Sequence, residues 1–155
     1  DFVTPIKAPR VLVTGSPLGG DAHKVFKIIQ EEGGVVVAMD SCTGRKPYVP
    51  LAKENSGDPL YALAEKYLQI PCSCMSPNQR RLDDLDEQIE RYKPDMVIDV
   101  ILVACHTYNI ESIKLERHIT QKHHLPFLKI TTDYSSEDLG QLKTRIGALL
   151  EMQKQ

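Results

Sequence analysis

The 155-residue sequence has little of what marks several special classes of protein. It contains no Trp, 6% aromatic residues and four Cys, and its 19 Lys and Arg nearly balance 21 Asp and Glu, giving a formal net charge of −2. Four Cys in a chain of this length make no disulfide framework, and we therefore expect a reducing, cytoplasmic location. Balanced charge without a basic block argues against a nucleic-acid partner.

Long apolar runs are also missing. The longest, residues 96–104, is interrupted by Asp99 and falls far short of the roughly 18 residues that cross a bilayer, so no membrane partner is expected. The start does not resemble a signal peptide, and because it is Asp1 rather than Met we expect a piece of a longer protein. With 41% hydrophobic residues the chain can bury a core without disulfides or a structural metal, so any metal would be functional.

Short β-branched runs alternate with helix-like segments along the chain. The order β-α-β-α-α-β-α-β-α predicts one α/β domain over residues 1–155, Rossmann-like or flavodoxin-like, with a four-stranded parallel sheet and helices on both faces. Residues 43–57, rich in Pro, Gly and charge, are predicted to be a surface excursion. Strands are predicted at 10–14, 35–39, 95–103 and 126–131, and helices at about 21–32, 59–70, 79–92, 109–122 and 138–152.

Residues that directly follow parallel strands share one edge of the sheet, where ligands bind in this fold class. Cys42 follows the second predicted strand, and Cys105 and His106 follow the third, so these side chains are expected on one edge although 105 − 42 = 63 positions separate the two Cys. Thiolates gathered there could ligate an iron–sulfur cluster or zinc. Free Cys also commonly pack as small apolar residues, and that alternative stays open.

The other candidates are weaker. Cys72 and Cys74 share one loop, but in an extended chain their side chains would point to opposite faces. His106 is a ligand, an acid or base, or a hydrogen-bonded structural residue. Residues 15–20 could cradle a phosphate, although a structural strand-to-helix turn is the favoured interpretation. The remaining stretches with unusual chemistry, His118, His123, His124 and the charged segment 80–91, are interpreted as solvent-exposed surface.

Five ordered stretches together resemble the C-terminal domain of the 2-hydroxyacyl-CoA dehydratase family, which includes the benzoyl-CoA reductase subunits and the 2-hydroxyglutaryl-CoA dehydratase D-component. The resemblance is closest to the double-cubane iron–sulfur proteins, and it extends over nearly the whole chain. The stretches are RVLVTGSPLGG (10–20), GGVVVAMDSCTG (33–44), DPLYALAEKYLQIPCSCMSPNQRRL (58–82), VIDVILVACHTYNIES (97–112), and TTDYS with GQLKTRI (131–146).

The resemblance implies a two-domain protein of which this chain is the second half. In such proteins Cys from both domains hold a 4Fe-4S or double-cubane cluster, which receives low-potential electrons from an ATP-hydrolysing iron–sulfur activator. The ligand of the C-terminal domain corresponds to Cys105, with Cys42 as the next candidate and Cys72, Cys74 and His106 as weaker ones. The implied partners are the missing N-terminal domain, the activator, a second subunit or second copy, and an acyl-CoA or other small substrate of anaerobic metabolism.

Ser16 departs from the pattern of close relatives, which have TGCP where this sequence has TGSP. A hydroxyl is a poorer iron ligand than a thiolate. The sequence thus predicts the cluster-binding domain of an ATP-dependent dehydratase-like lyase or reductase-like iron–sulfur enzyme, inactive in isolation and without an intact cluster of its own. The alternatives are a non-catalytic α/β binding domain with structural Cys and a phosphate-binding loop at 15–20, and a zinc site formed by the Cys.

Overall fold

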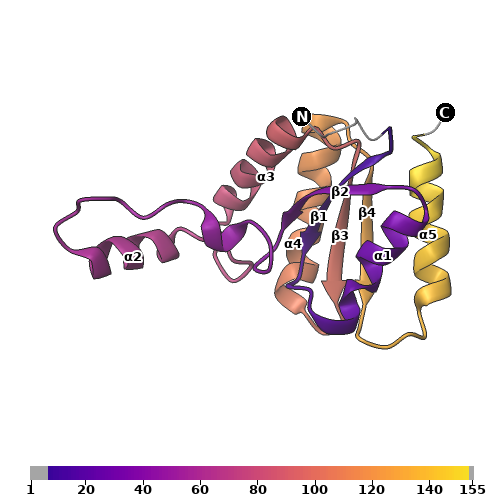
Figure 1. Ribbon diagram of the computed structural model, residues 1–155, viewed down its shortest axis with the longest axis horizontal. Helices are drawn as coiled ribbons and strands as arrows, with labels where there is room; N and C mark the ends of the chain where they lie inside the picture. Colours follow the sequence, from indigo (N-terminus) through magenta and orange to yellow (C-terminus); the bar gives the residue numbers. More distant parts are fainter. Residues whose placement is uncertain (1–6, 154–155) are drawn as a thin grey trace, which may run out of the picture.

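Four parallel strands form the central sheet of the computed structural model, which describes residues 7–153 (Figure 1). The order across the sheet is β2-β1-β3-β4, so β1 lies between β2 and β3. The predicted parallel α/β architecture is confirmed. The strands are β1 Arg10–Gly15, β2 Val35–Asp40, β3 Met96–Leu102 and β4 Phe127–Thr132.

Helices cover both faces of the sheet, as Figure 1 shows. One face of β1 carries Val11 and Val13 into a core with α1 (Lys24–Glu31) and α5 (Leu139–Glu151). The alternate residue Leu12 faces α3 (Gln79–Tyr92) and α4 (His106–His118) in a second core. Side chains of successive strand residues point to opposite faces, and so an apolar run without alternation is what a doubly covered strand requires.

Helix boundaries differ from the sequence prediction at two places. The first helical segment begins as a 3-10 turn, Gly20–His23, before α1 starts. The helix predicted from residue 109 starts at His106, because the carbonyl of Cys105 already accepts the Asn109 amide at 3.0 Å. It then continues as the π-helix η3, Ile119–His123. Among the described residues, no helix has both the length and the apolar character needed to span a bilayer.

A long arm leaves the sheet between β2 and α3, and it carries α2 (Pro59–Leu68) well away from the body of the domain (Figure 1). Asp58 caps α2 by accepting the amides of Leu60 and Tyr61 at 3.0 Å each. Ala62 is the only residue of α2 that is buried. Large apolar side chains therefore stand exposed on the arm: Tyr48, Leu51, Leu60, Tyr61, Leu63, Tyr67 and Leu68.

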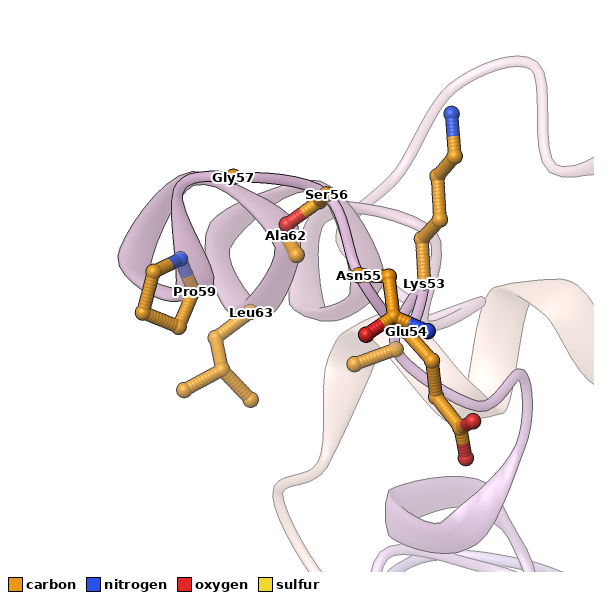
Figure 2. Close-up of a pocket in the computed structure, with 9 residues that line it drawn as sticks. Lys53, Glu54, Asn55, Ser56, Gly57, Pro59, Ala62 and Leu63 are labelled. Carbon is orange, nitrogen blue, oxygen red and sulfur yellow. The ribbon is translucent and has the colours of Figure 1, made fainter.

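A pocket lies within the arm, between the loop 52–57 and α2, and Figure 2 shows its lining. The lining mixes Lys53 and Glu54 with the apolar Ala62 and Leu63. It contains none of the four Cys, and it is formed at the far end of the arm rather than at the sheet edge. We therefore treat the pocket as part of the uncovered apolar surface of the arm.

Candidate cysteine site at the carboxyl edge of the sheet

Cys42 and Cys105 lie where the sequence places them, beyond the carboxyl ends of two strands. Cys42 follows β2 and is exposed, and Cys105 follows β3 and is half-buried at the N-cap position of α4. Because β1 separates β2 from β3, the two strand ends are about 10 Å apart across the edge. The predicted common edge is therefore present, with a gap between the two loops.

Cys72 comes to the same edge through hydrogen bonds that the sequence does not reveal. The Ser73 hydroxyl donates to Thr107 Oγ1 at 2.9 Å, which ties the Cys72 loop to the first turn of α4, directly after Cys105. Asn78 Nδ2 donates to the Cys72 carbonyl at 2.8 Å. Three loops that carry Cys are thus gathered beside the start of α4.

The two thiols of this loop differ in acidity. Residues 72–75 form a turn in which the Met75 amide donates to the Cys72 carbonyl at 3.0 Å, so the two side chains interact rather than pointing to opposite faces. The Cys74 backbone N–H lowers the pKa of Cys72, assisted by the charge of Lys46. The hydrogen bond and the charge of Cys72 raise the pKa of the exposed Cys74. Cys72 is therefore the better thiolate of the pair.

A buried charged network lies beneath these loops. Register places Asp40 of β2, Thr14 of β1 and Asp99 of β3 side by side on the face covered by α3 and α4. Arg81 of α3 is 1% exposed and reaches into this row, with its Nε 3.8 Å from Asp40 Oδ2 and its Nη2 3.2 Å from Thr14 Oγ1. Its Nη1 also donates to Glu111. Burial tends to lower the pKa of Arg81, but the carboxylates outweigh burial and raise it.

Lys46 and Tyr108 connect the network to the cysteines. Lys46 Nζ lies 3.5 Å from both Asp40 Oδ2 and the Tyr108 hydroxyl, and Lys46 is fully buried although it belongs to the loop after Cys42. Arg81 stacks on the Tyr108 ring at 4.7 Å from its centroid. Burial raises the pKa of Tyr108 despite Arg81, and the nearby thiols of Cys42 and Cys72 add to that rise. Tyr108 therefore remains neutral within the cysteine site, where its hydroxyl oxygen accepts from Lys46 Nζ.

Arg81 corrects the interpretation of segment 80–91 as a purely solvated face. Arg81 and Gln88 lie on the face of α3 that covers the sheet, and both are buried, with Gln88 Nε2 3.5 Å from Asp40 Oδ1. Helical periodicity alone does not identify a charged residue on the inner face, because its partners come from β2 and α4. The signal that could have found it is Asp40, a carboxylate ending an otherwise apolar strand and requiring a buried cation.

Asp99 is the least satisfied group of the site. Among the described residues neither of its oxygens has a hydrogen-bond partner of normal geometry, although the Ser112 hydroxyl and Arg81 lie near enough to favour its charge. Burial outweighs them and raises the pKa of Asp99. The native state consequently holds a proton that the unfolded chain releases at lower pH.

The Asp99→Asn substitution is expected to raise the free energy of unfolding by about 1 kcal/mol near pH 7, because it removes a buried charge with poor hydrogen bonding. The parent should lose stability as the pH rises from about 4 through the raised native pKa, since there the native state binds more protons than the unfolded state. Urea denaturation across this range, with the exposed Asp83→Asn as control, tests both points. If the free energy of unfolding changes with pH in the same way in the parent and in Asp99→Asn, then the pH dependence does not come from Asp99 and the assignment is wrong.

His106 and the glycine-rich loop of residues 15–20 are the remaining candidates predicted from the sequence. His106 is exposed on the first turn of α4, and within residues 7–153 its ring makes no hydrogen bond or ion pair with the buried network. Ser16 is buried, and its Oγ accepts the Leu102 amide at 3.1 Å, so it ties β1 to β3. The loop of residues 15–20 leads into a four-residue 3-10 helix, Gly20–His23, with Asp21 in its first turn. The negative charge of that carboxylate repels a phosphate and so opposes phosphate binding there.

His118 and His123 also differ from the surface residues predicted for them. Both are half-buried and both contact Asp86, whereas His124 is exposed. The physical reason is the π-helix, which carries the chain past His118 and directs His123 toward α3.

The fold and the site define a class of protein: a parallel α/β domain that presents cysteines from three loops along the carboxyl edge of its sheet. The sequence model of the family described as 2-hydroxyglutaryl-CoA dehydratase, D-component, matches residues 3–153, and the chain belongs to this family. It is 51% identical over 144 residues to the Escherichia coli (strain K12) protein named "Putative dehydratase subunit YjiM". That match covers 93% of this chain and 37% of the relative, so the chain spans little more than a third of the relative's length.

Proposed function

We propose that this chain is the C-terminal cluster-binding domain of an ATP-dependent iron–sulfur enzyme, either a 2-hydroxyacyl-CoA dehydratase or a double-cubane-type reductase. Membership of the dehydratase family supports the proposal. The observation that carries it is the gathering of Cys42, Cys72 and Cys105 from separate loops at one edge of the sheet. Cys105 is the proposed principal ligand and Cys42 the second.

The donor set fits an iron–sulfur cluster in its chemistry. The residues are free thiols at least partly open to solvent, and thiolates are the ligands such clusters use. Among the described residues, no group of three potential ligands that includes a Cys is close enough together to bind a single metal ion. We infer that a larger group, with further ligands from another domain, bridges the separation. When bound, the cluster supplies low-potential electrons and an iron that can accept a substrate oxygen.

The buried network gives this chain a positioning role. Lys46 pairs with Asp40, and these residues bracket the turn that carries Cys42, so their contact fixes both ends of that loop. Gly44 permits the turn, because a Cβ there would lie 2.2 Å from the Met39 carbonyl oxygen. Lys46 also places a cation near Cys72, where its charge helps to lower the pKa of the thiol and so favours the thiolate form that a metal requires.

The arm is the surface on which we propose that the rest of the longer polypeptide packs. Its exposed side chains include Leu60 at 77% and Leu51 at 83%, and large uncovered apolar areas mark interaction sites. The chain spans 37% of its relative's length, which leaves a further domain to cover them. The activator, a second subunit or second copy and an acyl-CoA substrate remain the other proposed partners.

The Cys105→Ala substitution in the full-length protein, purified anaerobically, is expected to remove most of the iron and sulfide, because it deletes a thiolate from the cluster. Cys42→Ala should lower both to a smaller degree. Iron and sulfide analysis, together with the broad absorption near 400 nm, measures the effect. In the full-length parent, the amides of residues 60–68 are expected to exchange more slowly than in the 155-residue chain, because the further domain covers the arm.

The matched control is Ser136→Ala, an exposed residue of the loop after β4, which leaves all four thiols and the Ser73–Thr107 hydrogen bond in place. Its iron content should equal that of the parent. If folded Cys105→Ala contains as much iron as the parent, the assignment of Cys105 as a ligand is wrong. If the parent is colourless and binds zinc, the site is a zinc site and not an iron–sulfur site.

A further inference from the structure

Two histidines at the end of α4 converge on one carboxylate of α3. His118 Nε2 lies 2.7 Å and His123 Nε2 2.5 Å from Asp86 Oδ1. The three potential ligand atoms all lie within 4.8 Å of one another. The side chains are between 13% and 17% exposed, which leaves one side of the group accessible to solvent.

A local change of helix type brings the two histidines together. In a regular α-helix, residues five apart point about 140° away from each other. The π-helix Ile119–His123 spaces its hydrogen bonds by five residues, and so His123 lies on the same side of the helix as His118. Their ring centroids are 5.8 Å apart, and the rings meet at 65° with both Nε2 atoms directed at Asp86.

We propose that Asp86, His118 and His123 bind a divalent transition-metal ion of the zinc class, which joins α3 to α4. Two imidazole nitrogens and one carboxylate oxygen are the protein ligands of many zinc sites that keep a fourth position for water. Bond lengths of about 2.0–2.1 Å would separate the ligand atoms by roughly 3.4 Å in a tetrahedron. Small side-chain rotations from the present contacts of 2.5 and 2.7 Å create that space.

The site is independent of the proposed iron–sulfur function. Residue 118 is 13 positions along the helix from residue 105, which corresponds to about 20 Å, and it lies toward the opposite edge of the sheet. Lys122 is the residue that competes with a metal, because its Nζ donates to Asp86 Oδ2 at 2.6 Å. Its exposed side chain is free to turn away when an ion neutralises the carboxylate.

Titration with Co²⁺ tests the site in the 155-residue chain with all four Cys changed to Ser, which removes competing thiols. We expect one equivalent to bind with visible d–d absorption and without a sulfur charge-transfer band. Zn²⁺ at a hundredfold excess over its Kd should raise Tm by roughly 5–10 °C. His118→Ala and His123→Ala should each weaken binding at least tenfold, whereas the neighbouring control His124→Asn should not.

Lys122→Met distinguishes a metal site from a network that only joins two helices. We expect this variant to bind Co²⁺ at least twofold more tightly, since it removes the competing cation. The same chain without its four Cys provides a second readout: one equivalent of Zn²⁺ should shift the imidazole nitrogen resonances of His118 and His123 but not those of His23. The proposal is wrong if no saturable binding occurs, or if binding survives both histidine substitutions.

Discussion

The Arg81→Met substitution is expected to destabilise the 155-residue chain by about 3–5 kcal/mol. Arg81 is almost completely buried between Asp40, Glu111 and the ring of Tyr108. Met fills a similar volume but has no charge, and so its introduction leaves two carboxylates without their main cation. Urea denaturation monitored by circular dichroism gives the free energy of unfolding directly.

Arg80→Met is the matched control, because residue 80 lies on the same helix turn but is exposed. Its effect should stay within about 0.5 kcal/mol. Adding Asp40→Asn to Arg81→Met should restore part of the lost stability, because it removes one of the uncompensated charges. An Arg81→Met chain as stable as the control would mean that the network contributes nothing to folding.

The Gly15→Ala substitution is expected to cost about 4 kcal/mol, because steric overlap and backbone strain act together. Gly15 has φ +117°, and an added Cβ would lie 2.1 Å from the Val100 carbonyl oxygen. That oxygen accepts the Ser16 amide at 2.8 Å, so the overlap falls where β1 joins β3. If β1 moved away from β3 to relieve the overlap, the hydrogen bond from the Ser16 amide to the Val100 carbonyl would break, and the sheet edge that carries the cysteines would be disturbed.

Gly19→Ala in the same loop is the control, because a Cβ there meets no atom within 4 Å and φ is not positive. Thermal melting of both variants separates close approach from the general effect of adding a methyl group. We expect Tm of Gly15→Ala to fall by roughly 8–16 °C and that of Gly19→Ala to stay near the parent value. Equal melting temperatures would contradict the close approach of β1 to β3.

Much of the arrangement was predictable because it depends on local pattern. Within the predicted strand 95–103, residues 96–101 are buried on both faces of the sheet, as an apolar run interrupted only by Asp99 indicates. The position of Cys42 and Cys105 on one edge followed from parallel topology alone, since every strand of such a sheet ends at the same side. The role of these Cys as ligands stays a prediction.

Other features depend on residues that are far apart in sequence and leave no local signal. Arg81 is one charged residue among many on α3, and only β2 and α4 decide that it is the buried one. The Cys72 loop joins the edge through Thr107, which lies 107 − 73 = 34 positions from its partner Ser73. His123 faces Asp86 because one segment of helix adopts π geometry, a choice that side-chain periodicity does not encode.

The amino-acid sequence by itself determined the order of strands and helices, the parallel sheet and the edge to which Cys42 and Cys105 belong. These follow from hydrophobic periodicity, turn residues and chain connectivity, which act between near neighbours. Tertiary structure alone decided which charges are buried and which side chains meet, as in the pairs Arg81–Asp40 and His123–Asp86. Their energies depend on separation in space and on exclusion of water, and neither quantity exists until the helices dock on the sheet.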